Sequence, residues 1–137
     1  MHIFRRTLTV ALLSVICSCV WAQATDPAVT LIYFGTPSCP SCRAWKLFDL
    51  PKLKETDEFK ASKFVEIQKA IPQPIPNADK FPSDLAPMRD AISNKFGGKI
   101  SSPMFAIVKG NIVTWTWSGA PNNAQVVKEL QAAFKVE

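Results

Sequence analysis

Histidine and cysteine are both scarce in this chain of 137 residues, and their scarcity limits the chemistry that it can perform. His2 is the single histidine, and it lies in an N-terminal segment that we expect to be removed. The four cysteines are Cys17, Cys19, Cys39 and Cys42. Removal would leave two cysteines and no histidine, which excludes a cysteine–histidine nucleophilic pair and a structural zinc site with four such ligands. Because an arginine follows the last cysteine, the chain also lacks a haem-attachment motif.

The chain also lacks an apolar run long enough to span a membrane comfortably. Arg5 and Arg6 are followed by an almost wholly apolar or small stretch over residues 8–21, and then by Ala-Gln-Ala. This order is typical of a secretory signal peptide, which we predict over residues 1–24 with cleavage after Ala22 or Ala24. We therefore expect a single domain over residues 25–137 that is periplasmic or secreted, without stable membrane insertion. An uncleaved anchor and lipidation at Cys19 are the alternatives.

A strong excess of charge is absent too. The formal net charge of the full chain is +5, and loss of the two N-terminal arginines would leave fourteen basic and eleven acidic residues, a net charge of +3. The basic residues are spread along the chain rather than clustered. The charge pattern therefore gives no reason to predict nucleic-acid binding.

The most informative stretch that is present covers residues 29–43. A run of β-branched and aromatic residues over 29–34 predicts a buried strand, and residues 35–38 predict a turn. Pro40 suits the first turn of a helix, so Cys39 should lie just before the helix and Cys42 one turn later. Unpaired N–H groups and the positive end of the helix dipole should lower the pKa of Cys39. We therefore predict that Cys39 is a nucleophile and that Cys42 resolves the mixed disulfide.

The strand, the turn and the Cys-Pro-Ser-Cys motif at the start of a helix resemble the thioredoxin family. A second point of resemblance lies downstream, where Ser102 and Pro103 precede an apolar run over residues 104–108. The resemblance implies an α/β fold in which helices flank a central mixed β-sheet. It also implies that Pro103 is a cis-proline facing the disulfide and that Ser102 offers its backbone to a bound peptide. Gly119 would lie beside the same groove.

Two departures from the thioredoxin pattern concern proton transfer. Tyr33 stands where the family has a buried acid beneath the disulfide, and Ser38 replaces the tryptophan before the first cysteine. Glu66, on the next predicted strand, is a possible substitute for the acid. The sequence therefore does not decide whether a buried carboxylate relays protons in this protein.

The residues between and after the cysteines should tune the reduction potential. Pro40 and Ser41 lack the histidine of strongly oxidising relatives, but the Ser41 hydroxyl can donate a hydrogen bond to a thiolate. Arg43 and Lys46 add positive potential. We therefore expect an intermediate potential.

The remaining pattern predicts the other elements around this motif. A helix over residues 43–50 should place Trp45 and Phe48 inward until Pro51 kinks or ends it, and residues 52–60 should form a second helical piece. Residues 64–67 alternate as a strand. Five prolines make residues 69–87 an irregular loop, either a connector or a surface that selects a partner.

The C-terminal half is predicted to contain two helices and a hairpin. An apolar stripe with helical spacing, closed by Gly97-Gly98, consists of Leu85, Met88, Ile92 and Phe96. Residues 104–108 and 112–117 should form a hairpin whose Trp115 and Trp117 share one face, either packed beneath a helix or lining the substrate groove. The last helix, over residues 122–136, should begin with a capping asparagine and pack through an inner stripe of Val126, Val127, Leu130 and Phe134.

We predict from these features a protein thiol–disulfide oxidoreductase that exchanges disulfides with cysteine-containing proteins, as a reductase or an interchange protein. It needs no cofactor or metal, and a membrane protein is a possible electron donor. A purely structural disulfide is disfavoured, because so short a loop contributes only about 2 kcal/mol. The alternatives are a copper(I) chaperone that uses the same thiols, with Met88 or Met104 as a soft third ligand, and a non-catalytic binding module.

Overall fold

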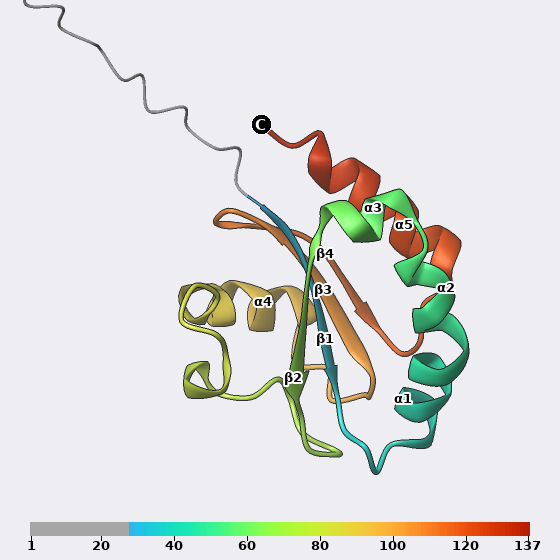
Figure 1. Ribbon diagram of the computed structural model, residues 1–137. Helices are drawn as coiled ribbons and strands as arrows, with labels where there is room; N and C mark the ends of the chain where they lie inside the picture. The colour runs from blue at the N-terminus through green and yellow to red at the C-terminus, as the bar shows by residue number, and fades with distance from the viewer. Residues whose placement is uncertain (1–27) are drawn as a thin grey trace, which may run out of the picture.

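A four-stranded mixed β-sheet forms the middle of three layers, and helices cover both of its faces (Figure 1). The structure is a computed structural model that describes residues 28–137. The strand order is β2-β1-β3-β4, in which β1 pairs parallel with β2 and antiparallel with β3, and β3 pairs antiparallel with β4. The strands are β1 (Val29–Gly35), β2 (Lys63–Gln68), β3 (Met104–Lys109) and β4 (Ile112–Ser118). The predicted α/β fold with a central mixed sheet is confirmed.

The predicted signal peptide over residues 1–24, with its cysteines and both cleavage positions, lies outside the described residues. Among the helices of residues 28–137, none combines the length and the apolar character needed to cross a membrane.

The sheet separates two apolar cores because successive side chains of a strand point to opposite faces. Leu31 and Ile107 belong to the core on the face covered by α1, α2, α3 and α5. Ile32 and Ala106, their neighbours along the same strands, belong to the core on the face covered by α4. Every residue of β1 is buried, which fits its position in the interior of the sheet.

The helix that follows β1 continues past the position where the sequence suggested a stop. Trp45 points inward as predicted and is 1% exposed, but the prediction for Phe48 is wrong, because this side chain is 62% exposed. The reason is a π-helical turn, in which the Leu50 N–H donates to the Trp45 carbonyl five residues back. The next inward residue after Trp45 is therefore Leu50. The segments are α1 (Pro40–Ala44), the π-helix η1 (Trp45–Asp49) and α2 (Leu50–Lys54).

Pro51 accounts for the wide turn. A proline cannot donate a hydrogen bond, and in a regular α-helix its ring collides with the carbonyl four residues earlier. Pro51 lies in the first turn of α2, where both problems are relieved. It changes the helix geometry rather than ending the helix, so the second helical piece is shorter than predicted and consists of α3 (Asp57–Ala61).

The proline-rich segment is irregular apart from two short 3-10 turns, η2 (Ala78–Lys80) and η3 (Ala86–Met88). Some of its apolar side chains nevertheless enter the core, since Ile75 and Phe81 are both buried, whereas Ile71 is exposed. The Arg89 guanidinium donates to the carbonyls of Ile75 and Pro76, at 3.4 and 3.1 Å. These contacts hold the segment against α4 (Arg89–Phe96).

The predicted apolar stripe before Gly97 is confirmed, because all four of its side chains are buried. Gly97 ends α4 with a φ of 61°, a left-handed conformation that glycine adopts without strain. The hairpin of β3 and β4 is also confirmed.

The last helix, α5 (Asn123–Phe134), begins as predicted, since the Asn122 side chain accepts a hydrogen bond from the Gln125 N–H. Val126 and Leu130 are fully buried against the sheet. Of the two stacked tryptophans of β4, Trp115 packs against this core, whereas Trp117 is 38% exposed. The prediction that a helix covers their shared face therefore holds for Trp115 only.

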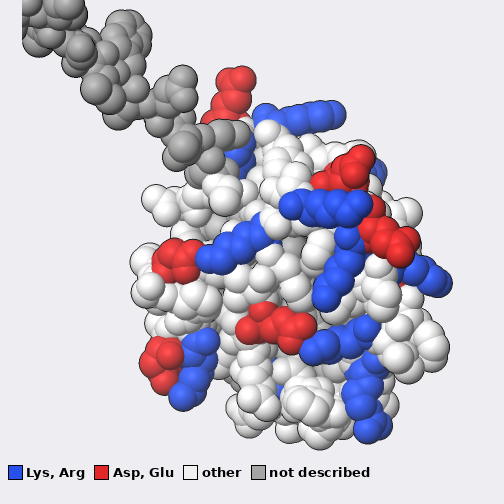
Figure 2. Space-filling model, viewed as in Figure 1, with Lys and Arg blue, Asp and Glu red and all other residues white. Residues whose placement is uncertain are grey.

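Charges of both signs alternate over the face seen in Figure 2, where most of the blue Lys and Arg side chains lie near red Asp and Glu side chains. Two exposed ion pairs are Lys46 with Glu66, at 2.8 Å, and Lys63 with Asp84, at 2.6 Å. Exposed pairs of this kind contribute little to stability.

Candidate functional site

Cys39 and Cys42 form a disulfide where the chain passes from β1 into α1. Cys39 has extended backbone angles and caps the helix, and its Sγ accepts a hydrogen bond from the Cys42 N–H at 3.1 Å. The predicted location of both cysteines at the start of the helix is confirmed. The same N–H would stabilise a Cys39 thiolate after reduction, because a charged acceptor strengthens a hydrogen bond.

Both cysteines are nearly covered, with exposed fractions of 2% for Cys39 and 1% for Cys42. The two sulfur-bearing side chains therefore differ little in exposure. So little exposed surface restricts the partners whose sulfur can reach the disulfide.

The segment before β3 packs against the disulfide, 60 residues later in the chain. The Ser102 Oγ lies 3.3 Å from the Cys42 Sγ, and the Ser41 hydroxyl donates to the Ser102 carbonyl at 3.1 Å. The peptide bond between Ser102 and Pro103 is cis. The structure thus brings together Cys42, Ser41, Ser102 and Pro103.

Gly119 completes this group of residues. Its N–H donates to the Pro103 carbonyl at 2.8 Å, so Gly119 lies next to the proline. Its φ of +95° is strained for any other residue, although a side chain would meet no atom within 4 Å. The glycine is needed for its backbone conformation rather than for lack of space.

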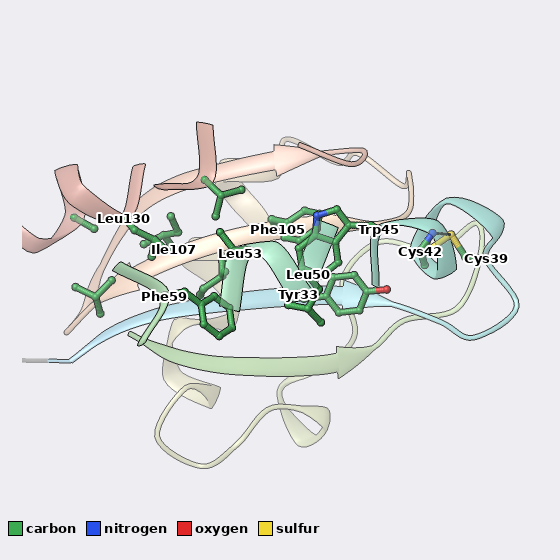
Figure 3. Packing of buried hydrophobic residues seen from close by; sticks show 14 residues of the cluster. Tyr33, Cys39, Cys42, Trp45, Leu50, Leu53, Phe59, Phe105, Ile107 and Leu130 are labelled. Atoms are coloured by element: carbon green, nitrogen blue, oxygen red, sulfur yellow. Dashed lines mark hydrogen bonds between the residues drawn. A yellow bond between two sulfur atoms is a disulfide. The ribbon is translucent and has the colours of Figure 1, made fainter. Parts of the chain in front are cut away.

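Three aromatic rings lie between the disulfide and the rest of the core, as Figure 3 shows. Tyr33 stacks on Trp45 at a centroid distance of 5.2 Å, and Phe105 packs edge-on against both rings. Burial, with a smaller contribution from the negative charge of Glu66, raises the pKa of Tyr33 to about 12. The hydroxyl at the position of the family's buried acid therefore stays protonated at neutral pH.

A cavity of about 650 Å³ opens beside the disulfide and is lined by Cys42, Tyr33, Arg43, Lys46 and Glu66, among others. Glu66 lies opposite Tyr33 in the register of β1 and β2, and the side chains of both residues line this cavity. Its carboxylate pairs with the Lys46 ammonium at 2.8 Å. This pairing offsets the positive potential expected from Lys46.

The methionines that could assist a copper(I) ion do not lie at the thiols. Met88 and Met104 are buried in the core on the α4 side of the sheet, whereas the cysteines belong to the core on the other side. Within residues 28–137, no group of three or more histidine, cysteine, aspartate or glutamate side chains is arranged to hold a metal ion.

Lys69 is a residue near the site that the sequence did not indicate. Its side chain is 1% exposed, and its ammonium donates to the carbonyls of Ala70 and Ile100, both at 3.2 Å. Burial lowers the pKa of this ammonium. The contact with Ile100 connects the end of β2 to the segment that precedes Ser102. A lysine after an alternating strand pattern usually signals an exposed strand end, so only the tertiary contacts reveal its burial.

Solved structures with a similar fold include several thioredoxins. Thioredoxin f from spinach chloroplasts matches with a TM-score of 0.51 and 19% identity, over 86% of this chain and 88% of that chain. Thioredoxin f2 from Chlamydomonas reinhardtii matches with a TM-score of 0.50 and 15% identity, over 80% and 82% of the two chains. A periplasmic thioredoxin from Paracoccus pantotrophus has a TM-score of 0.48 and 18% identity, over 78% of this chain and 99% of that chain.

No protein-family model and no curated protein sequence matches the chain. The structural matches are under 25% identical, so they establish the shape of the backbone and carry no activity with them. Together with the four-stranded mixed sheet and the disulfide at the start of α1, they show that this chain has the thioredoxin fold.

Proposed function

We propose that this protein is a thiol–disulfide oxidoreductase that exchanges disulfides with cysteine-containing proteins. The observation that carries the proposal is the Cys39–Cys42 disulfide, which caps α1 and packs against Ser102 in a thioredoxin fold. A disulfide that closes so short a loop adds little stability, whereas its position at a helix start favours a reactive thiolate.

The exchange proceeds in two steps that conserve electrons and sulfur. The Cys39 thiolate attacks one sulfur of a substrate disulfide, forms a mixed disulfide with it and releases the other substrate sulfur as a thiolate. The Cys42 thiolate then attacks the Cys39 Sγ, re-forms the Cys39–Cys42 disulfide and releases the second substrate thiolate. Two electrons pass from the protein to the substrate, and the reverse sequence oxidises a substrate dithiol.

The segment that packs against the disulfide supplies the substrate-binding backbone in this proposal. Ser102 would contact an extended substrate segment through its backbone, with Pro103 and Gly119 shaping the same groove. The bond from the Gly119 N–H to the Pro103 carbonyl supports this role, because it fixes the two residues relative to each other.

The direction of electron flow is proposed to favour reduction or disulfide interchange. Pro40 and Ser41 place one neutral hydroxyl near the nucleophile, and the nearby Lys46 is neutralised by Glu66. Without a cationic ring between the cysteines, the Cys39 thiolate is less stabilised than in strongly oxidising relatives, which makes the dithiol a better reductant than theirs. The protein would act in the periplasm or outside the cell, as the N-terminal sequence suggests, and a reductase there needs an electron donor such as a membrane protein.

Substitution of the two cysteines tests the activity. Cys39→Ser should abolish the insulin reduction that the protein catalyses with dithiothreitol as the electron donor. Cys42→Ser should accumulate mixed disulfides with substrates, because the resolving attack is lost. The matched control is the double variant, which should trap nothing. Recovery of insulin reduction in the Cys39→Ser variant, or failure of Cys42→Ser to trap any substrate, would overturn the proposal.

The reduction potential of the cysteine pair, measured in glutathione buffers, tests the direction. A value toward that of thioredoxin, about −270 mV, supports a reductase, and a value toward about −120 mV identifies a donor of disulfides instead. A non-catalytic module would keep partner binding in the Cys39→Ser variant. A copper chaperone would give an absorbance change stoichiometric with copper(I) that Cys42→Ser abolishes.

A further inference from the structure

The Ser41 hydroxyl lies between the nucleophile and the substrate-binding backbone. Its Oγ is 3.2 Å from the Cys39 Sγ and 3.1 Å from the Ser102 carbonyl oxygen. A hydroxyl has one hydrogen to donate, and a carbonyl can only accept. The two neighbours of Ser41 therefore compete for the same hydrogen. The Ser102 hydroxyl contacts the other sulfur, with its Oγ 3.3 Å from the Cys42 Sγ, so it does not take the place of Ser41 beside Cys39.

The competition has different outcomes in the two redox states. In the disulfide, the Cys39 sulfur carries no charge and is a weak acceptor, so the hydroxyl donates to the Ser102 carbonyl. When the disulfide is reduced and Cys39 ionises, its sulfur becomes a charged acceptor, and hydrogen bonds to charged groups are roughly twice as strong as neutral ones. The hydrogen then turns to Cys39 by rotation about the Cβ–Oγ bond, and the Ser102 carbonyl loses its donor.

We propose that Ser41 is a positioning residue that couples the charge on Cys39 to the substrate-binding backbone, releasing the Ser102 carbonyl to accept a substrate N–H when Cys39 is a thiolate. The inference rests on the proposed function, in which that carbonyl contacts an extended substrate. The Ser41 hydroxyl is the group that connects substrate docking to the reactivity of Cys39.

The coupling acts equally in both directions, as any linkage between two binding events must. A substrate N–H that donates to the Ser102 carbonyl makes that oxygen a weaker acceptor for Ser41, and the Ser41 hydroxyl then turns more readily to the Cys39 thiolate. Docking of a peptide therefore lowers the pKa of Cys39. The nucleophile becomes more reactive when a substrate backbone is in place and less reactive in the free protein.

The test measures the pKa of Cys39 from the pH dependence of its alkylation by iodoacetamide, with modified Cys39 identified by mass spectrometry. The reduced protein is titrated alone and with saturating insulin B-chain peptide in which serine replaces both cysteines, so that no exchange can occur. In the wild type, the peptide should lower the pKa of Cys39 by about one pH unit, which is a tenfold change in thiolate formation. In Ser41→Ala, the pKa without peptide should be higher by a similar amount, and the peptide should no longer change it.

Two further variants separate this role from a structural one. Ser41→Thr keeps a hydroxyl at the same place and should restore the response to the peptide. Ser38→Ala removes a neighbouring hydroxyl that bonds Thr36 rather than either sulfur, and should behave as the wild type. Carbon-13 labelling gives a direct readout, because the Ser102 carbonyl resonance should move as Cys39 ionises in the wild type and stay fixed in Ser41→Ala.

An equal response to the peptide in the wild type and in Ser41→Ala would overturn the inference, and so would a Ser102 carbonyl resonance that ignores the ionisation of Cys39. A wild-type protein whose Cys39 pKa does not respond to saturating peptide would overturn it as well. These measurements need no turnover. A protein that shows the coupling yet reduces no insulin would contradict the proposed function alone, and a protein that reduces insulin without the coupling would contradict this inference alone.

Discussion

Tyr33→Phe should leave disulfide exchange nearly unchanged, although Tyr33 stands where thioredoxins have a buried acid. The substitution removes one hydroxyl and keeps the ring that stacks on Trp45 and meets Phe105 edge-on. With a pKa of about 12, the hydroxyl is ionised in about one molecule in 10⁵ at pH 7, a cost of about 7 kcal/mol. Because the hydroxyl keeps its own proton at neutral pH, it is not available as a base for the Cys42 thiol.

The assay is the pH profile of insulin reduction for the wild type and Tyr33→Phe. We expect the two profiles to have the same shape, with rates within a few-fold of each other. A loss of one limb of the profile, or a rate reduced by more than about tenfold at neutral pH, would refute the reasoning and make Tyr33 a participant in proton transfer.

The same pKa gives an independent check through stability at alkaline pH. The folded protein holds the Tyr33 proton up to about pH 12, whereas the unfolded chain releases it near 10. The free energy of unfolding of the wild type should therefore fall relative to that of Tyr33→Phe between these values, by up to about 3 kcal/mol. Urea titrations with the disulfide intact would measure this difference, and parallel curves for the two proteins would contradict the assignment.

Three further predictions concern residues around the site. Lys69→Met should change the pH dependence of stability, because burial lowers the pKa of Lys69 below 10.5 in the folded protein. As the pH approaches 10.5, the free energy of unfolding of the wild type should therefore rise relative to that of the variant. Urea titrations at several pH values would measure this difference. Gly119→Ala should destabilise the protein by about 1–3 kcal/mol, because the φ of +95° at this position is strained for alanine. The variant should also bind peptide more weakly in calorimetry. Unchanged stability would show that the backbone at this turn relaxes without strain. Trp45→Ala should lower the free energy of unfolding by about 3–5 kcal/mol, whereas Phe48→Ala, on the exposed side of the same helix, should lower it by less than about 0.5 kcal/mol. Denaturant unfolding measures both, and equal losses would contradict the π-helical register.

The parts of the fold that the sequence predicted are those fixed by local pattern. The strand over residues 29–34, the cysteines at a helix start, and the stripe of Met88, Ile92 and Phe96 all follow from periodicity and from helix-start and helix-stop residues. The hairpin of β3 and β4 follows from two apolar runs separated by a turn. Such signals involve few residues and survive in the tertiary structure.

The parts that sequence did not predict depend on contacts between distant segments. Phe48 has helical spacing from Trp45, and only the wide turn ahead of Pro51 moves it outward. Ile75 lies among prolines, where nothing local indicates burial, yet it packs in the core because Arg89 holds that segment.

The same holds for the candidate site. Its members were predicted as separate residues, and their grouping around the disulfide was expected from resemblance alone. The bond from Ser41 to the Ser102 carbonyl joins residues 61 positions apart, so no spacing rule could reveal it.

The wide turn in the first helix also bears on how this chain can change length. A turn that bonds residue i to residue i+5 holds one residue more than an α-helical turn, so η1 contains one extra residue relative to a regular helix. The exposed side chains of η1 include Leu47 and Phe48. Deleting one of these residues would restore α-helical spacing between Trp45 and Leu50, but it would also return the ring of Pro51 to a position that a regular helix does not tolerate. The extra residue and the proline are thus tied together, and a shortened protein should fold well only when Pro51 is replaced in the same step.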